Sequence, residues 1–98
     1  MPDDPRESAA SPVVVVLPPV LVNLFPGSAR EVKMCASCVG EAIRQLDSLW
    51  PGMRDRLCDS TPQIRRHINV FVSGERATLT TRLSPGAEVI VMTAISGG

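Results

Sequence analysis

The strongest constraint on the fold lies at the C-terminal end, where a β-branched run leads into two glycines. The triplet Val89-Ile90-Val91 favours a strand, and Gly97-Gly98 close the sequence a few residues later. Because glycine has no Cβ, such a tail can lie extended in a slot too narrow for any other residue. The sequence therefore predicts a final strand that directs a bare Gly-Gly carboxylate away from the folded domain.

Apolar periodicity predicts one main helix and several short strands before that final strand. Val39, Ala42, Ile43 and Leu46 recur at helical spacing, so a helix is expected over residues 39–50, with Pro51-Gly52 as its stop. Strands are expected over residues 13–17, 31–34, 67–73 and 77–79, with an irregular arm over 20–25 and a helical turn over 53–57. This order favours an α+β fold, a mixed sheet with one main helix across one face.

The composition limits both the core and the kinds of partner. Of the 98 residues, 44% are hydrophobic but 3% are aromatic, so the core must be aliphatic. The ten basic and ten acidic residues cancel, which leaves no electrostatic footprint for nucleic acid or an anionic membrane. The apolar run 13–17 is too short to cross a bilayer, and the acidic start does not resemble a signal peptide. A cytoplasmic location with reduced cysteines is therefore expected.

The ends of the chain differ in composition from its middle. Residues 1–12 contain prolines and acids but few apolar side chains, which predicts a disordered N-terminal tail. Residues 13–96 are predicted to form the folded domain, and residues 97–98 a flexible, reactive tail.

Five short motifs occur along the chain in a fixed order. They are Leu17-Pro18-Pro19-Val20-Leu21, Val39-Gly40-Glu41-Ala42-Ile43, Ile68-Asn69-Val70-Phe71-Val72, Leu83-Ser84-Pro85-Gly86 and the ending Val89 to Gly98. This ordered set resembles the sulfur-carrier proteins of the β-grasp (ubiquitin-like) family. That family includes the small subunit of molybdopterin synthase, the thiamine-pathway carrier and a carrier for cysteine synthesis. The resemblance implies a β-grasp fold, with the first and last strands parallel and adjacent in the middle of the sheet.

Three departures from the family pattern help to place the chain within it. Ala87 stands where an acidic residue is common, and Met92-Thr93-Ala94 replace the aromatic residue and prolines of the molybdopterin type. Thiamine carriers lack a loop like residues 59–66. The chain therefore resembles the cysteine-pathway type of carrier most.

The resemblance implies a chemistry centred on Gly98, supported by Gly97. An E1-like adenylyltransferase would adenylate the Gly98 carboxylate with ATP. Sulfur from a persulfide or sulfide donor would then displace AMP and leave a thiocarboxylate. An acceptor synthase would use this sulfur in cofactor or cysteine biosynthesis. The chain is thus expected to be a carrier, or the small subunit of a sulfur-transferring synthase, without a bound cofactor and not itself an enzyme.

A second function fits the same tail. A ubiquitin-like modifier would join its C-terminus to lysines of other proteins, because an adenylate or thiocarboxylate can be attacked by an amine. The chain has a single lysine, Lys33, which would limit lysine-linked chains of itself.

The motif Cys35-Ala36-Ser37-Cys38 precedes the expected helix and leaves several interpretations open. It fits a redox pair at the start of a helix, or a cysteine that accepts sulfur during its transfer. It also fits a zinc module completed by Cys58 and His67. No second CxxC follows, so ordinary reduced thiols and no metal site are expected. His67 is expected to be a surface or packing residue rather than a catalytic one. Arg54, Arg56, Arg65 and Arg66 are expected to form a solvated basic rim around the loop.

Strand alternation predicts a partner-binding surface. Successive strand residues point to opposite faces, so Ile68, Val70 and Val72 are expected under the helix. Phe71, Ile90 and Met92 then fall on the open face as an apolar patch leading toward the tail. Exposed patches of this kind commonly bind proteins.

Overall fold

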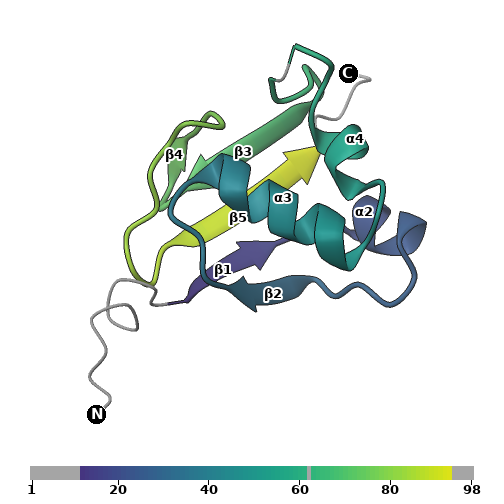
Figure 1. Cartoon of the computed structure of the whole chain (residues 1–98), viewed down its shortest axis with the longest axis horizontal. Coiled ribbons are helices and arrows are strands. Elements are labelled where there is room, and N and C mark those ends of the chain that lie inside the picture. The colour runs from purple at the N-terminus through teal and green to yellow at the C-terminus, as the bar shows by residue number, and fades with distance from the viewer. Residues whose placement is uncertain (1–11, 62, 94–98) are drawn as a thin grey trace.

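The computed structural model describes residues 12–61 and 63–93 (Figure 1). The predicted N-terminal tail falls outside these residues except for Pro12, and Gly97-Gly98 lie outside them as well. The elements are β1 (Val13–Val16), α2 (Pro19–Leu24), β2 (Glu31–Met34), α3 (Val39–Leu49), α4 (Met53–Leu57), β3 (Ile68–Val72), β4 (Glu75–Arg76) and β5 (Glu88–Thr93).

These strands form one mixed sheet in the order β2-β1-β5-β3-β4. β1 and β5 run parallel in adjacent positions, and the other neighbouring pairs run antiparallel. Figure 1 shows α3 lying across one face of this sheet. The predicted α+β architecture, with its parallel pair of first and last strands, is confirmed.

Aliphatic side chains from both layers make the core. Its fully buried members include Leu17 after β1, Leu46 on α3, and Met53 and Leu57 on α4. The three aromatic residues of the chain are half-buried. Phe25 and Trp50 pack against the edge of the core, and Phe71 lies on the other face of the sheet. The expectation of a core without rings is therefore confirmed.

The segment predicted as an irregular arm is the helix α2 instead. Pro18 has extended backbone angles, with φ −73° and ψ 155°, and its carbonyl accepts hydrogen bonds from the N–H groups of Leu21 and Val22. Pro19 occupies the first helical position, where a missing N–H costs no intrahelical bond. The Pro-Pro pair therefore ends β1 and also begins a helix.

The predicted strand over residues 77–79 was also wrong, because pairing occurs earlier. Ser73 and Gly74 have φ values of 52° and 88°. Two positive values make the tight turn that matches the twist of a two-residue hairpin. Glu75 and Arg76 therefore pair at once with Val72 and Phe71 as β4.

The start of α3 is held by a neighbouring loop. Backbone N–H groups of Val39 and Gly40 donate to the carbonyls of Thr81 (3.0 Å) and Leu79 (2.9 Å). Cys38 is the N-cap and makes no side-chain capping bond. The loop thus satisfies helix N–H groups that a capping side chain would otherwise serve.

The carboxylate of Glu41 reaches back over the same helix start. It accepts hydrogen bonds from the Ser37 backbone N–H (2.6 Å) and hydroxyl (2.8 Å). These bonds lower the pKa of the Glu41 carboxyl below its ordinary value.

None of the helices within residues 12–61 and 63–93 has the length and apolar character needed to span a membrane.

Candidate functional site

The strand that leads to the C-terminal tail occupies the middle of the sheet. β5 pairs with β1 over residues 88–90 and with β3 over residues 89–93, so its last three residues are held by β3. In this register Thr93, the last residue of β5, lies opposite Ile68, the first residue of β3. The predicted anchoring strand is therefore present. The reactive role of Gly97 and Gly98 stays a prediction, because both lie outside the described residues.

Burial along β3 and β5 separates two faces of the sheet. Val70 and Val91 are 1% and 3% exposed on the face covered by α3. Phe71 and Ile90 are half-buried and directly opposite each other on the other face, and Met92 is 48% exposed. The side chains expected on the open face are thus found there. Their role in partner binding remains a prediction.

The sequence analysis missed two members of this apolar surface. Val14 and Val16 on β1 are half-buried, alternating with two buried neighbours, and Val16 lies beside Ile90 in the parallel pair. The uniform Val13–Val16 run hides this alternation. The open-face patch therefore comprises Val14, Val16, Phe71, Ile90 and Met92.

A polar hollow lies near the end of the sheet from which the tail departs. It encloses about 680 Å³ and is lined by Leu24, Phe25, Pro51, Gly52, Asp55, Arg56, Arg65 and His67. His67 directly precedes Ile68, the pairing partner of Thr93, so the hollow lies near the end of β5. Of the predicted basic rim, Arg56 and Arg65 line this hollow, Arg65 and Arg66 line a second cavity, and Arg54 lines neither.

The three cysteines occupy different environments. Cys35 is exposed, Cys38 is intermediate and Cys58 is buried. Burial raises the pKa of the Cys58 thiol, which keeps it protonated and a poor nucleophile. Within the described part of the chain, no three His, Cys, Asp or Glu residues come together as metal ligands. The structure therefore does not bring together Cys35, Cys38, Cys58 and His67, the four residues of the zinc alternative.

Comparison with curated proteins gives a relative that spans nearly the whole chain. The sulfur carrier protein CysO of Mycobacterium tuberculosis is 28% identical over 91 residues, which cover 87% of this chain and 98% of that protein. This chain is thus similar to a sulfur carrier along most of its length. No protein-family model matches it.

Solved structures agree with this relationship. The Amycolatopsis orientalis BexX/CysO complex matches with a TM-score of 0.78 and 27% identity, covering 88% of this chain and 99% of the matched chain. SAMP1 from Haloferax volcanii matches with a TM-score of 0.75 and 25% identity, covering 90% and 100%. The predicted ubiquitin-like β-grasp fold and the resemblance to sulfur carriers are both confirmed.

Proposed function

We propose that this protein is a sulfur carrier whose Gly98 carboxylate is adenylated by an E1-like enzyme and converted to a thiocarboxylate. The observation that carries the proposal is the similarity to the CysO sulfur carrier along 87% of the chain. The thiocarboxylate then donates sulfur to an acceptor synthase in cofactor or cysteine biosynthesis. ATP is consumed by the activating enzyme, and the carrier itself is a co-substrate.

The chemistry requires activation because a carboxylate is a poor electrophile. A Gly98 oxygen attacks the α-phosphorus of ATP and releases pyrophosphate, which gives an acyl adenylate. Sulfide then attacks the carbonyl carbon, the bond from that carbon to the bridging oxygen breaks, and AMP leaves. The product holds its sulfur as a nucleophile attached to a protein, so free sulfide does not have to reach the acceptor.

The position of β5 supports this use of the tail. Thr93 is held in the middle strand, and five residues follow it up to Gly98. Five extended residues reach roughly 17 Å, enough to enter the active site of a partner while the domain stays outside. Deleting Gly98 is therefore expected to abolish sulfur loading without lowering the free energy of unfolding.

Reconstitution with an E1-like enzyme, ATP and sulfide tests the proposal by intact mass spectrometry. We expect the mass gain of one oxygen-to-sulfur exchange in the full chain and no gain in the chain lacking Gly98. An unchanged mass with activators that load related carriers would refute the proposed chemistry.

The open-face patch is the surface we propose for docking the activating enzyme. The related carrier of Amycolatopsis orientalis forms a complex with a partner protein, BexX. Met92→Asp is expected to weaken activator binding by about tenfold, since it places a charge in an apolar contact. Phe71→Asp tests the neighbouring strand in the same way. Leu49→Asp is the matched control, because Leu49 is an exposed apolar residue on α3, away from the patch.

Protein modification is a second candidate, favoured by the similarity to SAMP1, a small archaeal modifier protein. The same activated carboxylate would form an isopeptide bond with a lysine amine. Immunoblots of cell extract separate the two functions. A ladder of stable high-mass species that disappears on Gly98 deletion would support modification.

A further inference from the structure

The edge of β3 is open along its first half. β4 pairs with Phe71 and Val72 alone, and the last bond of the ladder runs from the Ala77 N–H to the Val70 carbonyl (2.7 Å). The chain then turns away through residues 78–80. An edge strand without a neighbour presents backbone groups that can pair with another chain.

Two specific backbone groups face this opening. In a strand, successive residues direct their N–H and C=O groups to opposite edges. The Ala77 bond shows that Val70 faces the β4 edge, so Ile68 faces it too. The Ile68 N–H donates to the Arg65 carbonyl (2.9 Å). The Ile68 carbonyl and the Val70 N–H remain without a backbone partner within the described residues.

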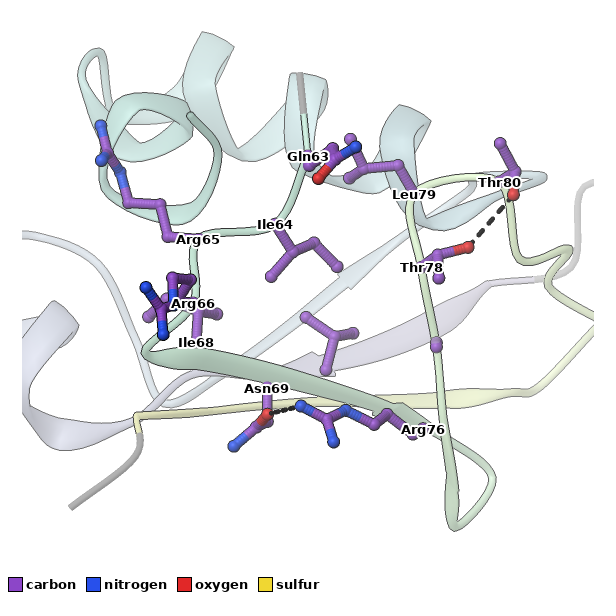
Figure 2. A pocket seen from close by; sticks show the side chains of 12 residues that line it. Gln63, Ile64, Arg65, Arg66, Ile68, Asn69, Arg76, Thr78, Leu79 and Thr80 are labelled. Carbon is purple, nitrogen blue, oxygen red and sulfur yellow. Dashed lines mark hydrogen bonds between the residues drawn. The ribbon is translucent and has the colours of Figure 1, made fainter. Parts of the chain in front are cut away.

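A cavity of about 490 Å³ lies against this edge, and we call it the β3-edge groove. Figure 2 shows its two walls, with Ile64 in the loop before β3 and Leu79 in the segment after β4. Ile68, Val70 and Ala77 form its apolar base. The groove is thus wide enough for a side chain and has a strand edge beside it.

The charged residues that line the groove are all basic. Arg65, Arg66 and Arg76 line it, and no acidic residue does, although the whole chain has zero net charge. Arg65 Nε donates to the Asp55 carbonyl (2.7 Å), and Arg76 Nη2 donates to Asn69 Oδ1 (2.6 Å). Each guanidinium has five N–H donors, so these contacts orient the side chains and leave donors for a carboxylate.

We propose that the β3-edge groove binds an extended, acidic peptide segment of a partner protein as a strand parallel to β3. One peptide residue would donate its N–H to the Ile68 carbonyl and accept from the Val70 N–H, which is the pattern of a parallel bridge. Its side chain lies on the same face as that of Asn69, and the side chains of the peptide residues before and after it point to the opposite face, between Ile64 and Leu79. Acidic neighbours in the peptide pair with Arg65, Arg66 and Arg76. Backbone pairing gives affinity and the arginines give selectivity. The proposal does not depend on sulfur chemistry at the C-terminus.

The test is an NMR titration of the full ¹⁵N-labelled chain with a capped peptide in which Val-Ile-Val is flanked by two glutamates on each side. We expect saturable shifts centred on the amides of Val70 and Leu79. The same peptide with lysines in place of glutamates should bind at least about tenfold more weakly, because it meets three arginines.

Matched charge variants locate the interaction. Arg66→Glu should weaken binding of the acidic peptide by about tenfold. Arg54→Glu should leave binding unchanged, because Arg54 is exposed on α4 outside the groove. The spectra without peptide report whether each variant is folded.

Four results would overturn the proposal. They are an absence of saturable shifts, equal binding of the lysine peptide, equal loss in Arg54→Glu, and shifts centred on the open-face patch. A shift of the Val70 amide with protein concentration alone would assign the groove to a second copy of the chain and would also reject it.

Discussion

The two faces of the sheet place the same residue types in different environments. Val15 and Val16 are chemically identical neighbours on β1, yet Val15 is 1% exposed in the core while Val16 is half-buried on the open face. On β5, Val91 and Met92 divide in the same way. Aliphatic character alone therefore does not mark the core. The side on which α3 packs decides which residues are buried in the core and which stay partly exposed on the open face.

The largest effect expected from this contrast comes from placing a charge on each face. Val91→Asp would bury an unpaired carboxylate, and we expect the free energy of unfolding to fall by about 4 kcal/mol or more, enough to unfold a small domain. Met92→Asp, one residue away, should cost about 0.5 kcal/mol. Urea denaturation of both variants measures the difference. An unfolded Met92 variant beside a stable Val91 variant would reverse the assignment of the faces.

A smaller contrast is expected on the helix that covers the sheet. Leu46 is fully buried and Leu49 is 57% exposed, although both lie on α3. Leu46→Ala should lower the free energy of unfolding by about 3 kcal/mol, through lost burial and the cavity left behind. Leu49→Ala should change it by less than about 0.5 kcal/mol. Thermal and urea midpoints check both values, and equal losses would show that α3 is covered on more than one side.

The smallest effect concerns the solvent-facing start of α3. The Ser37 N–H beside Glu41 holds the pKa of this carboxyl below its ordinary value of 4.5. The contribution of the ionised Glu41 carboxylate to stability is therefore complete above pH 4.5. It is lost as the pH falls through the lowered pKa of this group in the folded state. Glu41→Gln should make the loss of stability on acidification shallower.

Asp59 also contributes to the dependence of stability on pH. Hydrogen bonds from Thr61 also lower the pKa of the Asp59 carboxyl, so part of the acid dependence should survive in Glu41→Gln. Urea midpoints from neutral pH to below 4.5 measure the two slopes. Parallel slopes for the variant and the original chain would show that the Ser37 contact contributes nothing to folding.

The elements that the sequence predicted well are those with strong local periodicity. The spacing of Val39, Ala42, Ile43 and Leu46 determines α3, and alternation along β3 and β5 determines which side chains lie beneath it. The Pro18-Pro19 pair was misjudged because proline ends a strand and also favours the first turn of a helix. Local pattern alone could not decide between these two roles.

The two cavities could not be predicted because each is formed between segments that are far apart in the sequence. The β3-edge groove exists because β4 ends at Arg76 and the chain then leaves β3. β4 begins as early as Glu75 because Ser73 adopts a positive φ, which serine rarely does. The hollow near Thr93 brings together His67, Arg56 and Phe25 from three separate segments. The sequence identified the basic residues but had no means of dividing them between two sites.

Localisation of the transferred sulfur tests the central claim most directly. After reaction with an E1-like enzyme, ATP and sulfide, tandem mass spectrometry of the C-terminal peptide should place a single oxygen-to-sulfur exchange on Gly98. Peptides containing Cys35, Cys38 and Cys58 should be unchanged. Sulfur found on a cysteine, with Gly98 unmodified, would contradict the carrier mechanism proposed for this chain.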